Sequence, residues 1–498
     1  MWVFRGTLSA QKHNMEESGL SVLNSPNAPS CGESSRPPSS LVDTVDLDTI
    51  QCCSRRSYNS PVNTTAMSIR ISTRRFKPSL CWQCQVQAER NFQRVTSVQN
   101  KPQTRANSTH TVSKDWQHNY PAESNKACWI QLKNRTLIRL DGPDATDFLH
   151  NLIPAPVLPL DDKSHIIFSA FLNAKGRIIH DVFVSKPSKD DANNWLLDVD
   201  TNSAPAIMSH LKKHKLRSQF KLEKLSPEQA AVFYMWPGPD QNATGDPPHM
   251  QQDPRPNMGM RMYSTSVEEA RKTFATNESS QELEWEDYMV HRMLNGLAEG
   301  PVEITSGSAL PQESNLDFCG GIDFHKGCYV GQELTIRTHH TGIVRKRILP
   351  VQIYTDDNPI PHDQTAPIYN PSLSLPQPPH EANISKRGAK GRSGRSTGKW
   401  LGGYGNIGLA LCRLETMTDL SLTAEGSQYD PETDEFEVSW EAGAGEGDAD
   451  GQLKKNSVKV KAFVPPWLKQ GIENTVKARN DRSQARRRQA EDEDEDVD

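Results

Sequence analysis

The segment Gly320-Gly-Ile-Asp-Phe-His-Lys-Gly-Cys-Tyr-Val-Gly-Gln-Glu333 combines one thiol with closely spaced glycines. Gly327 precedes Cys328 and Gly331 follows it by three residues, so the backbone can turn tightly and leave the thiol uncovered. The nearby charge of Lys326 favours the thiolate, which is the form that attacks electrophiles or binds metal. The alternative is a buried structural cysteine, since cysteine is among the most buried residue types and one thiol specifies no reaction.

Four further motifs accompany this segment. They are Ile138-Arg-Leu-Asp-Gly-Pro-Asp-Ala-Thr-Asp-Phe-Leu149, Leu172-Asn-Ala-Lys-Gly-Arg-Ile-Ile-His-Asp181, the pair Asp253-Pro-Arg255 and Gly259-Met-Arg261, and a stretch from Tyr288 to Asp317. Together with Lys326-Gly-Cys-Tyr-Val-Gly-Gln-Glu333, they resemble the motifs of the YgfZ/Caf17/Iba57 family, and most closely those of its fungal mitochondrial branch. These are folate-binding-fold proteins of iron–sulfur cluster biogenesis, related to the aminomethyltransferase (T-protein) of glycine cleavage. The resemblance covers residues 128–354 and the strands near 400–415 and 456–470.

The resemblance implies an α+β chain with a folate-binding (aminomethyltransferase-like) fold and a C-terminal β-barrel domain. It also implies a role: an iron–sulfur cluster assembly factor of the mitochondrial matrix, needed for late maturation of [4Fe–4S] proteins such as aconitase and radical-SAM enzymes. The implied partners are A-type (IscA-like) scaffold proteins and the [4Fe–4S] client enzymes.

The resemblance also points to site residues. It implies that Cys328 supplies the thiolate that ligates or transfers a cluster, with Lys326 and Asp181 as further candidates. The remaining signature residues are Gly327, Gly331, Gln332 and Glu333. Tetrahydrofolate is the cofactor that the resemblance implies, and arginine side chains suit the carboxylates of its glutamate tail. The candidates for its pocket are Arg177, Tyr288, Arg292 and Glu303, and the alternative for all four is fold-stabilising hydrogen bonding.

The number of cysteines bears on how a cluster is held. Five of the nine cysteines precede the expected folded region: Cys31, Cys52, Cys53, Cys81 and Cys84. The other four are Cys128, Cys319, Cys328 and Cys412, without the tight C-x-x-C spacing in which about four thiolates usually hold a cluster. We therefore expect Cys328 to give one thiolate to a transient cluster shared with a partner.

A folate-dependent aminomethyl- or methyltransferase is the competing hypothesis. Such an enzyme needs an acid–base carboxylate near the folate nitrogen. Aminomethyltransferases carry paired aspartates after L-N-x-x-G-G, whereas this chain has His180-Asp181, and Arg177 in place of the second glycine. One carboxylate is missing, and Asp181 is equally well explained as a structural turn partner. A purely structural adaptor, which would not need Cys328, is the third class.

Two strand-like stretches on either side of the turn Asn173-Ala-Lys-Gly176 predict a hairpin over 165–184. The sequence also predicts a further strand over 228–236 and helices over 144–152 and 204–216. The stretch from Gln332 to Arg337 is also expected to be helical. The adjacent His339 and His340 are expected at a polar surface rather than as metal ligands. Strand-like stretches at 343–353, 408–414 and 458–464 indicate a small β domain that closes the chain.

The remaining segments are expected to be disordered, because proline-rich and charge-rich stretches bury too little apolar surface to order. Residues 1–66 are interpreted as an extension before a start at Met67, and 67–127 as a transit peptide and linker rich in Arg and Ser. The folate-binding-type domain is placed at 128–342, with a loop insertion at 237–256. The barrel domain is placed at 343–470 with insertions at 355–399 and 416–455, and a charged disordered tail at 471–498.

Composition excludes two function classes. The chain has 498 residues and only 35% hydrophobic ones, and no run approaches the ~18 apolar residues of a membrane-spanning helix. The net charge of -5 conceals a basic segment, since residues 49–114 carry +10 and residues 115–498 carry -12. An acidic body is a poor generic binder of nucleic acid, because that affinity depends on neutralising phosphates. We therefore expect neither a membrane nor a nucleic-acid partner.

Overall fold

The computed structural model describes residues 127–157, 166–187, 193–236, 250–264, 266–275, 280–388, 396–423, 425–441 and 455–495. The predictions of an extension, a start at Met67 and a transit peptide lie outside these residues. Among the residues described, no helix combines the length and the apolar character that crossing a membrane requires.

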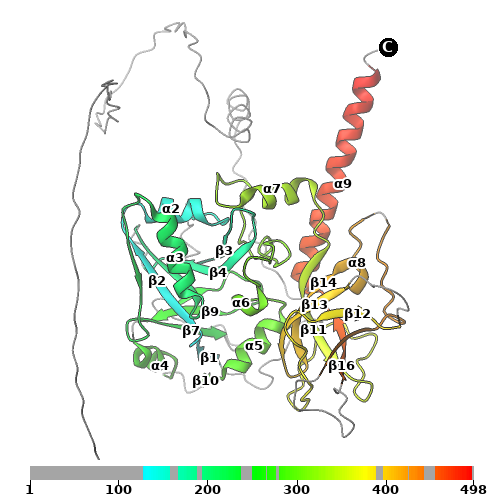
Figure 1. Ribbon diagram of the computed structural model, residues 1–498, viewed down its shortest axis with the longest axis horizontal. Coiled ribbons are helices and arrows are strands. Elements are labelled where there is room, and N and C mark those ends of the chain that lie inside the picture. Colours follow the sequence, from blue (N-terminus) through cyan, green and yellow to red (C-terminus); the bar gives the residue numbers. More distant parts are fainter. Residues whose placement is uncertain are drawn as a thin grey trace, which may run out of the picture. The chain divides into compact units, whose positions relative to one another are not determined.

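One five-stranded antiparallel sheet contains the predicted hairpin (Figure 1). Its strands, in spatial order, are β3 (Ile166–Leu172), β4 (Ile178–Ser185), β5 (Asn194–Asp200), β2 (Arg135–Asp141) and β6 (Lys221–Lys224). Helices α2 (Ala145–Leu152) and α3 (Ala204–Lys215) supply buried side chains to the same apolar cluster as this sheet. Every residue of β3 is buried, which explains why its sequence is apolar without alternation.

The second five-stranded sheet is antiparallel except for the pair formed by its first two strands. Its order is β10 (Ser280–Glu282), β1 (Ala127–Gln131), β7 (Ala231–Trp236), β9 (Met260–Ser264) and β8 (Met250–Gln252). Helix α4 (Val267–Ala275) packs on this sheet through Ala270. Helix α5 (Trp285–Leu294) and the short α6 (Gly300–Glu303) follow it in the chain.

A closed six-stranded barrel follows, as the resemblance implies. Its strands, in order around the barrel, are β11 (Lys346–Tyr354), β14 (Ile407–Arg413), β13 (Gly398–Tyr404), β12 (Asn383–Lys386), β15 (Phe436–Glu441) and β16 (Lys455–Ala462). The Trp400 ring fills space beside Gly408, where a Cβ would lie 2.2 Å from it. One apolar cluster continues from both sheets through α5 into this barrel, so the described residues share a continuous core.

The predicted disorder is wrong for the described residues of two insertions and of the tail. Residues 355–388 are ordered because their polar groups find partners on the barrel: the Gln352 side-chain oxygen accepts from the Ile368 amide at 2.9 Å. Residues 425–441 are likewise ordered and include β15, while α8 (Leu414–Met417) precedes them. The tail forms helix α9 (Pro466–Glu495), rich in residues that favour helix. Of the loop insertion 237–256, residues 250–256 are ordered and include β8.

A cluster of buried charged side chains joins the two sheets. Its guanidinium groups belong to Arg135, Arg255 and Arg261, and its carboxylates to Asp181, Asp198, Asp253 and Glu299. These seven residues are called the buried charge network below. It links β2, β4 and β5 of one sheet to β9 of the other and to the segment that follows β8. The Arg261 guanidinium also lies 3.6 Å from the centroid of the Phe183 ring.

Opposite charges keep the network ionised despite its burial. Burial by itself would raise the pKa of Glu299, but the guanidinium groups of Arg261, Arg255 and Arg135 hold it well below its usual range. Glu299 Oε2 accepts from Arg255 at 2.8 Å and from Arg261 at 3.0 Å. Removing one partner from such a cluster leaves an uncompensated buried charge, which is strongly destabilising.

We predict that Glu299→Gln lowers the free energy of unfolding by about 3 kcal/mol or more, because three buried guanidinium groups lose a shared anion. The matched control is Glu282→Gln, which breaks an exposed 3.1 Å pair with Arg271 and is expected to cost about 0.5 kcal/mol or less. Urea denaturation of both variants checks this. Equal effects of the two substitutions would contradict a structural role for the network.

Candidate functional site

The signature loop, residues 320–331, presents its cysteine to solvent. Cys328 is exposed, and so is Gly327, where an added Cβ would meet nothing within 4 Å. The next residue, Tyr329, is buried, and its backbone N–H donates to the Gln332 side-chain oxygen at 3.0 Å. The loop therefore alternates an anchored side chain with an accessible thiol, and the alternative of a buried structural cysteine is wrong for Cys328.

Lys326 anchors the same loop from the other side. Its ammonium donates to the backbone carbonyls of His150, Ile153 and Ala155 at 2.5, 2.8 and 2.9 Å. These carbonyls lie in or just after the last turn of α2, where a positive charge is favourable. Burial lowers the pKa of Lys326 to about 8. All three protons of the ammonium serve this contact, and an effect of Lys326 on the Cys328 thiol stays a prediction.

Glycines let the signature loop touch the β3–β4 hairpin. Gly331 has φ +78°, and a Cβ there would lie 2.4 Å from the Asn173 carbonyl oxygen. Gly176, in the hairpin turn, has φ +74°, and its Cβ would lie 2.8 Å from the Gly331 carbonyl oxygen. The two motifs that were predicted separately from the sequence are thus in contact, and the contact requires glycine on both sides.

The helix after the loop is α7 (Gln332–Thr341), which extends the predicted helical stretch by four residues. Glu333 is exposed in its first turn and makes only a 4.0 Å pair with Arg337. His339 and His340 also lie on α7. His339 is half-buried and stacks on Phe324 with ring centroids 3.7 Å apart, so the prediction of a polar surface holds for the exposed His340 only. The described residues contain no group of three or more His, Cys, Asp or Glu able to hold a metal ion.

The other cysteines of the described residues are buried. They are Cys128, Cys319 and Cys412. Burial raises the pKa of Cys319 to about 12, and it also raises the pKa of Cys412. These thiols stay protonated at neutral pH and lie within the core, whereas Cys328 lies on the surface. The five earlier cysteines lie outside the described residues.

Three of the remaining candidates are held in buried interactions. Asp181 accepts from Arg135 Nη1 at 3.1 Å and from the Gly300 amide at 3.1 Å, which supports its interpretation as a structural partner. The Tyr288 hydroxyl lies among Arg255, Arg261 and Glu299, and burial raises its pKa to about 12. Arg292 donates to both carboxylate oxygens of Glu303 at 2.6 and 2.8 Å. An arginine bound in this way is not available as a clamp for a ligand carboxylate.

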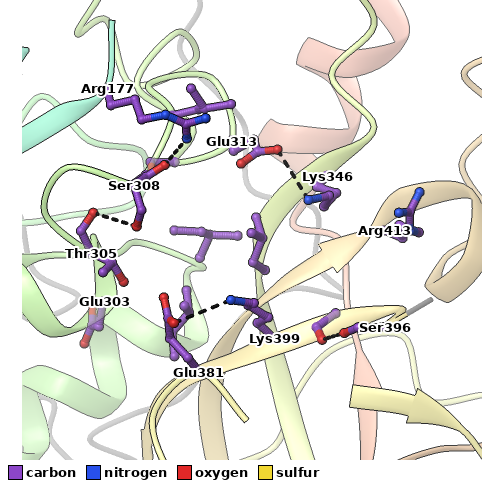
Figure 2. Close-up of a pocket in the computed structure, with 17 residues that line it drawn as sticks. Arg177, Glu303, Thr305, Ser308, Glu313, Lys346, Glu381, Ser396, Lys399 and Arg413 are labelled. Atoms are coloured by element: carbon purple, nitrogen blue, oxygen red, sulfur yellow. Dashed lines mark hydrogen bonds and ion pairs between the residues drawn. The ribbon is translucent and has the colours of Figure 1, made fainter. Parts of the chain in front are cut away.

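A cavity of about 600 Å³ lies where the sheet region meets the barrel (Figure 2). Of the four predicted pocket residues, Arg177 and Glu303 line it, whereas Tyr288 and Arg292 do not. Figure 2 shows Arg177 and Glu303 on one side and cationic barrel side chains on the other. The cations that the sequence analysis missed are Lys346, Lys399 and Arg413.

The cavity is polar, and only some of its cationic side chains are paired with a carboxylate. Lys346 lies 4.0 Å from Glu313, and Lys399 lies 3.5 Å from Glu381. Arg413 has no ion pair with any carboxylate in the part of the chain that the structure describes. Burial raises the pKa of Glu313. The arrangement suits a ligand with anionic groups. The sequence did not reveal this group of cations, because the three residues come from separate barrel strands.

We predict that Gly331→Ala destabilises the protein by about 2 kcal/mol, because a left-handed backbone and a 2.4 Å approach both oppose a side chain. Gly327→Ala is the control, since it changes the same loop in open space and is expected to leave the melting temperature unchanged. Thermal unfolding monitored by circular dichroism measures both. A loop that tolerates both substitutions equally would contradict the contact with the hairpin.

A comparison with protein families agrees with the C-terminal barrel. A family model described as "CAF17, C-terminal beta-barrel domain" matches residues 345–470. A crystal structure of glycine cleavage system aminomethyltransferase T from Bartonella henselae aligns with a TM-score of 0.48 at 13% identity, covering 70% of this chain and 88% of that one.

Several curated proteins that this chain resembles carry the name "Iron-sulfur cluster assembly factor IBA57 homolog, mitochondrial". The protein of Aspergillus oryzae is 45% identical over 390 residues, covering 73% of this chain and 86% of the relative. That of Coccidioides immitis is 41% identical, covering 71% and 85%. That of Neurospora crassa is 39% identical, covering 69% and 82%. The chain therefore belongs to the family of the mitochondrial iron–sulfur cluster assembly factors named IBA57 homologues.

Proposed function

We propose that this protein is an iron–sulfur cluster assembly factor of the mitochondrial matrix that acts in late maturation of [4Fe–4S] proteins. In this proposal Cys328 supplies one thiolate to a cluster that is shared with an A-type scaffold protein before transfer to a client enzyme. The observation that carries the proposal is that Cys328 is exposed, whereas the three other cysteines of the described residues are buried.

The number of ligands that a cluster needs is the reason to expect that it is shared between this chain and a partner. Iron–sulfur clusters are usually held by about four thiolates. The described part of the chain offers one accessible thiol, and the remaining ligands would come from the partner. An exposed thiol with no Cβ at the preceding Gly327 leaves room for another protein to approach the cluster closely.

The loop around this thiol is held in place before a partner arrives. Lys326 binds the loop to the end of α2, and the Tyr329 side chain is buried in the core. Gly331 allows the loop backbone to approach the hairpin closely. A thiol on such a supported loop loses little conformational freedom when it coordinates iron, which favours binding and precise placement. The surrounding residues thus serve to position Cys328.

We predict that Cys328→Ser abolishes the cluster reconstituted with an A-type scaffold protein, or changes its absorption and electron paramagnetic resonance spectra. The matched control is Cys412→Ala, which removes a buried thiol and is expected to leave the spectra intact. Maturation of aconitase in cells that carry only the variant gives the functional reading. Unchanged spectra together with unchanged aconitase activity would exclude Cys328 as a ligand.

We also propose that the cavity in Figure 2 binds tetrahydrofolate. Its volume of about 600 Å³ falls within the ordinary range of small-molecule sites. Arg413 and Lys399 would hold the carboxylates of the glutamate tail, and Glu313 offers an acceptor for ring N–H groups. Folate would supply a one-carbon carrier at this place.

The same geometry argues against aminomethyl transfer as the main activity. Asp181 is the carboxylate that remains in the hairpin motif, and it is bound by Arg135 and the Gly300 amide rather than lining the cavity. A general base must reach the proton that it removes. Folate binding without this base favours a structural or regulatory role for the ligand over catalysis.

We predict that tetrahydrofolate at ten times its dissociation constant stabilises the wild-type protein by about 1.4 kcal/mol. Arg413→Gln should reduce this effect at the same ligand concentration, because a cation of the cavity is lost. Arg345→Gln is the control, since Arg345 is exposed and is not among the residues lining the cavity. A thermal shift assay measures both, and no shift at millimolar ligand would refute folate binding.

A further inference from the structure

A second cavity lies between α7 and α9, behind the helix that follows the signature loop. Its volume is about 250 Å³. Its apolar lining comes from three parts of the chain: Phe318, Phe324, Ile343, Leu422, Ile472 and Val476. This space is called the α7–α9 cavity below. Neither the cluster ligand nor the folate cavity uses any of these side chains.

Two arginines of α9 line the same cavity. Arg479 donates to the Leu422 carbonyl, and Arg482 Nε donates to the Ala478 carbonyl at 3.1 Å. Neither guanidinium forms an ion pair with a carboxylate among the described residues. Asp317 also lines the cavity, but both of its oxygens are bound by Arg347, at 2.8 and 2.9 Å. The cavity therefore combines an apolar interior with an uncompensated positive edge.

The cavity is close to the reactive loop. His339 of α7 lines it and stacks on Phe324, which lies four residues before Cys328. Helix α9 continues past α7 and out of the body (Figure 1). Exposed Arg486, seven residues after Arg479, continues the positive charge along the same face of the helix. From Arg479 to Arg486 the helix rises by about 10 Å, so the positive charge extends beyond the cavity itself.

The volume of the cavity and the length of its charged edge favour a protein segment over a small molecule as the ligand. A volume of about 250 Å³ is below the ~300–1,000 Å³ of typical small-molecule sites, but it can hold one large apolar side chain. A charged edge of about 10 Å matches roughly three residues of an extended peptide. An apolar anchor flanked by carboxylates fits both the interior and the edge.

We propose that the α7–α9 cavity docks an acidic segment of a partner protein, with one apolar side chain in the cavity and carboxylates on Arg479 and Arg482. The assignment of this partner as the protein that shares the cluster at Cys328 rests on the proposed function. Docking here places that partner against Phe324, which belongs to the loop that carries the thiol. Because its edge is exposed, the contact weakens as salt screens the charges.

The test uses fluorescence anisotropy on the full-length protein with labelled twelve-residue peptides. Four of them carry a single Phe, Trp, Leu or Met among Asp and Glu residues, and the controls replace the anchor by Ala or the acids by Asn and Gln. We expect saturable, salt-sensitive binding of at least one anchored acidic peptide and of neither control. The double variant Arg479→Gln/Arg482→Gln should weaken binding about tenfold.

A matched double variant, Lys212→Gln/Lys213→Gln, removes two exposed cations from α3 and should leave peptide binding unchanged. Cys328→Ser should also keep peptide binding while losing the shared cluster, so that docking and cluster ligation fail separately. The proposal is overturned if no peptide binds up to millimolar concentration, or if the two double variants behave alike. It is also overturned if octanoate occupies the cavity and the peptides do not, which would make it a small-molecule site.

Discussion

The buried charge network is the constraint on which the rest of the structure depends. Arg261 pairs with Asp198 of one sheet at 2.6 Å and with Asp253, beside the other sheet, at 3.0 Å, so one guanidinium holds both sheets together. Because buried ions tolerate only well-defined partners, this arrangement admits one relative position of the sheets. Asp181 links the hairpin to the start of α6 through the same network, which sets the position of the turn against which the signature loop packs.

The loop that carries Cys328 is positioned on these sheets mainly by contacts with backbone atoms, and no ring of catalytic side chains surrounds it among the described residues. The hairpin turn meets Gly331, the end of α2 meets the Lys326 ammonium, and Cys328 is left as the exposed residue between these anchors. Such a loop is suited to present one ligand to another protein. Apart from Arg177, the cations of the two cavities lie farther along the chain, in the barrel and in α9. The C-terminal part therefore contributes most of the binding surfaces, while the N-terminal part positions the thiol.

Much of this could be predicted from the sequence. The hairpin, α2, α3 and three barrel strands lie within one to three residues of their predicted bounds, since apolar patterning and turn residues define them locally. The contact between Gly176 and Gly331 could not be predicted, because it joins positions 155 residues apart in the sequence. The sequence could not show whether Tyr288 and Arg292 bind a ligand or stabilise the fold. Their partners, among them Glu299 and Glu303, are charged residues whose burial a single sequence does not reveal. Composition wrongly predicted disorder for residues 355–388 and for α9, because both are polar. Residues 355–388 are held by hydrogen bonds to the barrel. Helix α9 is stabilised by helix-forming residues and by the buried Leu468 and Ile472.

The central claim is that this chain holds a cluster only together with a partner, because its described part offers one accessible thiol. Native mass spectrometry after anaerobic reconstitution measures this directly, since it reports the cluster mass on each species. The account predicts that the cluster mass appears on the complex with the A-type scaffold protein and is absent from this chain alone. A stable cluster on the isolated chain, with no partner bound, would contradict it.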